Sequence, residues 1–118
     1  MRNLGLATLA LTLALGATQA WAHAKPVQQS PAANASGPAP KAVSLAFSEA
    51  IEPAFSSLTI TDATGNTINT AKATVDDASH KTLSTPLPPL PAGNYVVTWA
   101  VVAHDGHRSH GSYRFTVK

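Results

Sequence analysis

Metal-binding side chains crowd into one short stretch of the chain, "HDGHRSH", which covers residues 104–110. Imidazole and carboxylate groups are ligands for divalent metals, and this stretch offers three histidines and one aspartate. If it continues the extended backbone before it, Asp105 and His107 lie on the same side, with Cα atoms about 7 Å apart. Gly106 between them gives room for a bulge or a turn. The spacing predicts a two-ligand metal pocket that needs further ligands from elsewhere.

A second source of ligands is His23, which directly follows a segment typical of a secretion signal. Arg2 gives that segment a positive start, residues 4–15 are almost wholly apolar, and "AWA" at residues 20–22 is a small-x-small cleavage site. We therefore expect residues 1–22 to be a cleaved signal peptide and residues 23–118 to be the mature domain. A free N-terminal His23 would offer its α-amine and its imidazole Nδ1 to one ion.

Together, His23, Asp105 and His107 would supply three nitrogens and one oxygen. Tetragonal nitrogen and oxygen ligation suits Cu(II), whereas Zn(II) accepts the same ligands but prefers a tetrahedron. Cu(I) favours thioether or thiolate ligands. The chain has no cysteine and a single methionine, Met1, which the signal removes. The ligand set therefore favours Cu(II) over Zn(II), which could also bind, and a methionine-based Cu(I) site is excluded in the mature chain.

A simpler interpretation of residues 104–110 is a polar hairpin loop, in which Asp105 and Gly106 form the turn and the histidines are solvated. His104 should point away from Asp105 and flank or support the site. His110 is expected at the surface, with a fifth, weak ligand as the alternative, and His80 is expected at the surface.

The other polar motifs do not indicate catalysis. Glu49 and Glu52 in "SEAIEP" are interpreted as exposed loop carboxylates and not as an acid and base pair, because no pocket signal surrounds them. No nucleophile elbow or phosphate-binding glycine loop occurs. We predict no catalytic residues and no cofactor other than copper.

Composition is consistent with one small exported domain. Removing 22 residues from the 118 leaves 96, and the eight Lys and Arg fall to seven, against six Asp and Glu. That balance argues against nucleic acid as a partner. No later apolar run approaches the length of a membrane span, so we expect a soluble monomer.

The elements that must position these residues are short strands. In "NYVVTWAVVA", residues 94–103, the side chains of Tyr95, Val97, Trp99, Val101 and Ala103 alternate onto one side. "GSYRFTV", residues 111–117, does the same with Tyr113, Phe115 and Val117, so the two strands should pair through the histidine loop.

Residues 41–47 and 56–60 are predicted core strands. Residues 67–76 and 80–87 are weaker, and we expect edge strands or loops there. Residues 30–40 are predicted to be a loop, and Phe47, Phe55 and Phe115 to join Trp99 in the core. The pattern predicts an all-β sandwich.

Three stretches resemble the CopC family of periplasmic copper resistance proteins: "HAKPVQQSPAANA", "VSLAFSEAIEPAFSSLTITDATG" and "PLPAGNYVVTWAVVAHDGHRSHGSYRFTV". The resemblance covers essentially the whole mature chain. It implies an Ig-like Greek-key β-sandwich of about seven strands that binds Cu(II) through the N-terminal His23 and through Asp105 and His107. The methionine-rich Cu(I) site of some members is missing. As partner it implies a CopD-type inner-membrane copper permease or another periplasmic copper protein.

The favoured function is a periplasmic Cu(II) carrier or buffer in copper homeostasis and resistance, and not an enzyme. Two alternatives stay open. A terminal histidine with a second histidine resembles the histidine brace of copper-dependent oxidative enzymes, which need an open coordination position. A metal-free Ig-like interaction module is the other, because fold does not fix function.

Overall fold

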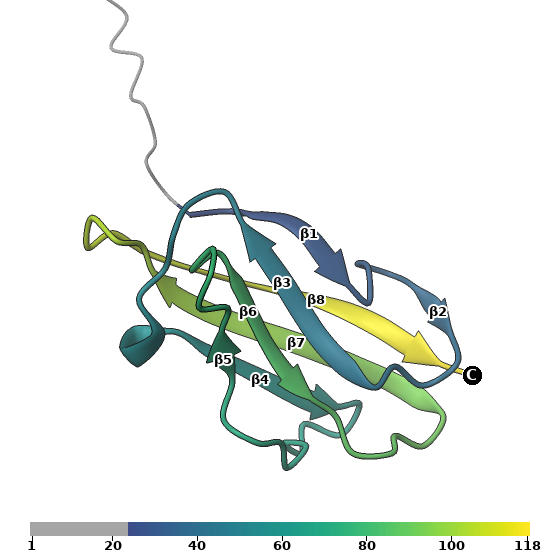
Figure 1. Cartoon of the computed structure of the whole chain (residues 1–118). Helices are drawn as coiled ribbons and strands as arrows, with labels where there is room; N and C mark the ends of the chain where they lie inside the picture. The colour runs from purple at the N-terminus through teal and green to yellow at the C-terminus, as the bar shows by residue number, and fades with distance from the viewer. Residues whose placement is uncertain (1–23) are drawn as a thin grey trace, which may run out of the picture.

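A computed structural model describes residues 24–118 as two facing four-stranded sheets (Figure 1). The first sheet has the order β1 (Pro26–Ser30), β3 (Ala42–Phe47), β6 (Thr82–Pro86) and β5 (Thr74–Val75). The second has the order β2 (Ser36–Gly37), β8 (Arg108–Val117), β7 (Gly93–Val102) and β4 (Ser57–Asp62). One short 3-10 helix, η1 (Pro53–Phe55), precedes β4. The predicted β-sandwich is confirmed, with eight strands instead of about seven.

The hairpin of β7 and β8 is the longest paired unit and carries the histidine loop. Its register runs from Gly93 opposite Val117 to Val102 opposite Arg108. The predicted inward face of β7 is confirmed, because Tyr95, Val97, Trp99 and Val101 are all buried. Trp99 lies directly over Gly111 of β8, where an added Cβ would be 2.6 Å from the indole Cζ2. Only glycine fits beneath this ring.

Apolar side chains from both sheets meet between them. Phe47 of β3 contacts Trp99 of β7 edge-on, with ring centroids 5.3 Å apart, and Tyr95 stacks on Phe115 at 5.4 Å. Each aromatic pair adds to the burial of apolar area that holds a sandwich together. The predicted core strands 41–47 and 56–60 correspond to β3 and β4.

Of the expectations about the segments without clear alternation, two were wrong and one was confirmed. Residues 82–86 form β6 inside the first sheet, between β3 and β5, where Leu83 and Thr85 are buried. The predicted loop at residues 30–40 contains β2, which pairs in parallel with the end of β8. Thr74–Val75 is an edge strand, as expected.

Phe55 departs from the prediction, whereas Tyr113 lies on the predicted face and packs against the core. Phe55 is 70% exposed, because it belongs to η1 and not to an alternating strand. Tyr113 is only partly buried, and within residues 24–118 its buried hydroxyl has no hydrogen-bond partner. Burial raises the pKa of Tyr113 to about 12.

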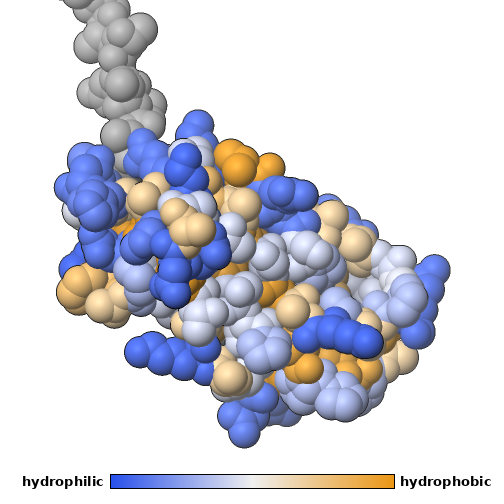
Figure 2. Space-filling model, viewed as in Figure 1, coloured by the Kyte–Doolittle hydropathy of each residue, from blue (hydrophilic) through white to orange (hydrophobic). Residues whose placement is uncertain are grey.

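The start of β1, the loop between β7 and β8, and η1 lie at the same end of the sandwich, opposite the C-terminus (Figure 1). Hydrophilic residues gather over this end in Figure 2. Across residues 24–118, the structure contains no helix long and apolar enough to span a membrane.

Candidate metal centre

A tight turn joins β7 to β8 and presents the predicted ligands. The N–H of Gly106 donates to the carbonyl of Ala103, and the N–H of Ala103 donates to the carbonyl of His107, both at 2.8 Å. Gly106 has a φ of +92°, a left-handed conformation that glycine adopts without strain. A turn followed by a left-handed glycine is a common way to close a short hairpin. The predicted turn at Gly106 is therefore confirmed.

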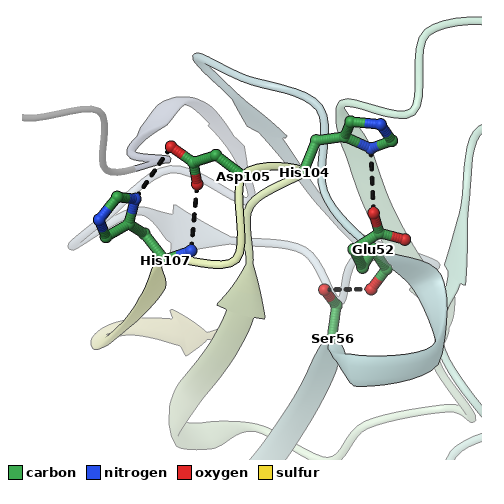
Figure 3. A network of polar contacts seen from close by, with 5 residues as sticks. All are labelled: Glu52, Ser56, His104, Asp105 and His107. Atoms are coloured by element: carbon green, nitrogen blue, oxygen red, sulfur yellow. Dashed lines mark hydrogen bonds and ion pairs between the residues drawn. The ribbon is translucent and has the colours of Figure 1, made fainter.

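Asp105 and His107 form a compact pair on one side of this turn (Figure 3). Oδ1 of Asp105 accepts the backbone N–H of His107 at 3.0 Å, and Oδ2 lies 2.9 Å from the His107 Nδ1. The backbone N–H of His107, followed by its imidazole, holds the pKa of the Asp105 carboxyl below its usual 3.8. The carboxylate is therefore ionised at neutral pH.

This pair has the chemistry of half a metal site. A neutral imidazole that donates from Nδ1 to a carboxylate carries its lone pair on Nε2, the form in which histidine ligates metals. In this conformation the Asp105 carboxylate supports the ring at Nδ1, so binding of one ion by both side chains requires the ring to turn. Both side chains are exposed, at 58% for His107 and 41% for Asp105. The structure brings the two predicted ligands together, although through a turn and not through continued strand alternation.

His104 points to the opposite side of the loop, as predicted. Its Nδ1 lies 3.0 Å from Oε1 of Glu52, and Glu52 in turn accepts the Ser56 hydroxyl at its backbone carbonyl, 2.8 Å away (Figure 3). The backbone beneath is paired too, because His104 N–H donates to Ala50 and Glu52 N–H donates to Val102. The segment before η1 thus holds the base of the loop.

The remaining described histidines lie elsewhere. His110 is exposed on the outer face of β8, opposite Ala100 of β7. His80 is exposed in the loop between β5 and β6, with a φ of +57°. Both surface expectations are confirmed.

The chain just after the predicted cleavage site is fixed beside the loop. His23 itself lies outside the described residues. Ala24 is 2% exposed, and its carbonyl accepts the hydroxyl of Ser109 at 2.8 Å. Lys25 and Ser48 exchange two further hydrogen bonds, at 2.8 and 3.1 Å. Ser109, two residues after His107, was not singled out in the sequence, because its partner is a backbone carbonyl far away along the chain.

No group of three or more histidine, cysteine, aspartate or glutamate side chains suited to a metal ion occurs in residues 24–118. Asp105 and His107, the two predicted ligands in this range, would therefore need additional donors to form a complete site. Ala24, whose carbonyl Ser109 binds, directly follows His23, the third predicted ligand.

Comparison with known proteins gives consistent matches over this domain. The family model described as "CopC domain" matches residues 26–118. Protein YobA of Escherichia coli strain K12 is 42% identical over 119 residues, covering 99% of this chain and 96% of YobA. Two solved structures are also similar. CopC from Methylosinus trichosporium OB3b has a TM-score of 0.77 and 37% identity, and covers 81% of this chain and 94% of its own. PcoC, a methionine-rich copper resistance protein from Escherichia coli, has a TM-score of 0.73 and 31% identity, covering 82% and 100%.

Proposed function

Because the chain belongs to the CopC family, we propose that it is a periplasmic copper-binding protein that carries or buffers Cu(II) in copper homeostasis and resistance. The observation that carries this proposal is the Asp105–His107 pair, which stands at the end of the sandwich where the chain after His23 is anchored. Copper is the cargo of this protein, and no chemical conversion is assigned to it.

The proposed ligands are the α-amine and imidazole of His23, the carboxylate of Asp105 and the imidazole of His107. This assignment requires cleavage after Ala22, because a peptide bond at His23 would remove the amine as a donor. Support comes from Ala24, whose carbonyl is bonded to Ser109 next to the loop. Consecutive Cα atoms are about 3.8 Å apart, so a residue directly before Ala24 can reach the loop.

Cu(II) is the proposed oxidation state because the donor set is nitrogen and oxygen. PcoC is described as methionine-rich, whereas this chain contains only Met1, which lies within the proposed signal peptide. A carrier is favoured over an oxidative enzyme because Asp105, as a ligand, would fill a position that oxygen activation needs open.

The test is a Cu(II) competition titration read by electron paramagnetic resonance on two versions of the mature protein. One begins at His23, and the other carries one extra glycine before it. We expect tight binding with a nitrogen-rich tetragonal signal only for the first. Equal binding by both would remove the terminal amine from the site, and binding by neither would refute the copper function.

Export and delivery complete the proposal. Residues 1–22 would direct the chain to the periplasm, and the soluble, monomeric domain would exchange copper with a CopD-type inner-membrane permease or with another periplasmic copper protein. Mass spectrometry of protein recovered from the periplasm tests the cleavage site, since the expected mature form begins at His23.

A further inference from the structure

We infer that the outer face of the β7–β8 hairpin, next to the histidine loop, is a docking surface for a protein partner. The partner presents an apolar side chain flanked by carboxylates. This inference rests on the proposed copper function, because the partner would be the one that gives or takes Cu(II). Four observations support it.

The first observation is an exposed aromatic ring beside a groove. Phe55, 70% exposed, forms part of a groove of about 340 Å³ whose other walls include Ala100, Val102, Arg108 and His110. An exposed phenylalanine in a concave, partly apolar site is typical of surfaces that bind another molecule. The groove has room for one side chain of a partner. A surface that binds a lipid membrane would instead be flat or convex.

The second observation is the charge of this face. The outward side chains of β8 include Arg108, His110 and Arg114, and within residues 24–118 neither arginine forms an ion pair. No aspartate or glutamate occurs among the residues of β7 and β8. The carboxylates of two neighbouring segments, Glu52 and Asp105, are each paired with a histidine. The residues that line the groove carry the fixed positive charge of Arg108 and no carboxylate, so the groove complements an acidic partner.

The third observation is the position of the groove along the hairpin. Val102 and Arg108 are opposite each other in the last register pair before the turn, and Arg108 directly follows His107. A partner seated there would lie beside the proposed copper ligands. Cu(II) could then pass between the two proteins without a change of oxidation state, with protons from the incoming ligands moving to those that are released.

The fourth observation is that the fold does not require these side chains. Phe55 contributes little to the core because most of its surface is exposed, and Arg108 and His110 are exposed as well. Their substitution can therefore be tested in a protein that still folds.

The experiment uses two short synthetic peptides with the same copper-binding Gly-Gly-His head. One has a tail of alternating glutamate and leucine, and the other a tail of alternating lysine and leucine. Stopped-flow spectroscopy measures Cu(II) transfer from the loaded mature protein to each peptide. We expect the acidic tail to accelerate transfer about tenfold at low ionic strength, with the advantage falling as salt is added.

Variants locate the effect on the surface. Phe55→Ser combined with Arg108→Gln should reduce the advantage of the acidic tail to about twofold or less. Arg114→Gln removes the same charge from the same strand farther from the loop, opposite Val96, and should retain most of it. Equal rates for the two tails on the unaltered protein, or equal loss in both variants, would overturn the proposal.

A copper-free measurement separates this proposal from the copper function. The acidic peptide without its head is titrated into the metal-free protein and followed by NMR. Shifts confined to the amides of residues 55, 100–102 and 108–110 support docking, even if Cu(II) binding itself fails. Identical shifts with both tails, or none with either, would overturn it. So would binding to phosphatidylglycerol vesicles that the acidic peptide does not displace, because that result would indicate a membrane surface.

Discussion

Two histidine–carboxylate pairs flank the same turn, and they differ in how the chain brings them together. Asp105 and His107 are two residues apart and meet at 2.9 Å through the turn itself. Glu52 and His104 come from distant parts of the chain and meet at 3.0 Å only because the segment before η1 pairs with the end of β7. Nearly equal distances therefore hide different roles. Under the proposed function the local pair supplies metal ligands, and the distant pair supports the loop that carries them.

The largest difference between the pairs should appear on removing one histidine from each. His107→Ala should weaken Cu(II) binding at least about a hundredfold, since even groups that only support ligands contribute 10–100-fold to metal affinity. His104→Ala should leave Cu(II) affinity within about tenfold of the original. Competition titration against a chelator of known affinity measures both. Equal losses would mean that His104 is also a ligand.

A second prediction concerns the anchor that connects the loop to the chain after His23. Ser109→Ala removes the hydrogen bond to the Ala24 carbonyl and should lower the free energy of unfolding by about 1 kcal/mol, measured by urea denaturation. Cu(II) affinity should fall as well, because the anchored segment carries the proposed terminal ligands. Ser112→Ala, at an exposed position on the same strand, is the matched control and should change neither quantity.

A smaller effect is expected from the distant pair alone. Glu52→Gln keeps the size of the side chain and weakens its attraction to His104. Because the His104 side chain is 80% exposed, the loss in unfolding free energy should stay below about 1 kcal/mol. The backbone hydrogen bonds of Glu52 and Ala50 remain, so the loop should keep its conformation and the NMR chemical shifts of its amides should change little. Loss of the dispersed NMR signals of the loop amides in this variant would show that the side-chain pair, and not the backbone, holds the turn.

The smallest effect should be a change in the pKa of Asp105 in the metal-free protein. Its pKa is held below 3.8, so its contribution to stability is present above the pKa of the unfolded chain and is lost as pH falls through the folded value. His107→Ala keeps the first cause, the backbone N–H, and removes only the imidazole. The pKa should therefore rise only part of the way to its usual value, as ¹³C NMR of the carboxyl carbon can determine. A complete return would assign the shift to the imidazole.

The same contrast between local and distant contacts explains what the sequence could predict. Strict alternation identified β7, β8, β3 and β4 and their buried faces. The turn at Gly106 and the proximity of Asp105 to His107 also follow from neighbouring residues. Phe55 does not belong to an alternating segment. Its hydrophobicity alone led to the prediction that it is buried, and that prediction was wrong.

Contacts between distant segments could not be obtained in this way. The strand β6 looks polar and is interior only because β3 and β5 pair with both of its edges. Likewise, nothing local to Glu52 identifies His104 as its partner, and nothing local to Ser109 identifies Ala24. The resemblance to the CopC family correctly identified the family and the sandwich, but the two contacts that hold the loop needed the folded chain.

The glycine beneath Trp99 has a practical consequence for work on this protein. The chain has two tryptophans, Trp21 and Trp99, and removal of residues 1–22 would leave only the second. Trp99 is 8% exposed and lies over Gly111, four residues after His107. The mature domain would thus contain a single tryptophan, shielded from water and located in the strands that the histidine loop joins. Its emission should shift to longer wavelength when the sandwich unfolds and dim when paramagnetic Cu(II) binds, so one unlabelled sample reports on both folding and metal loading.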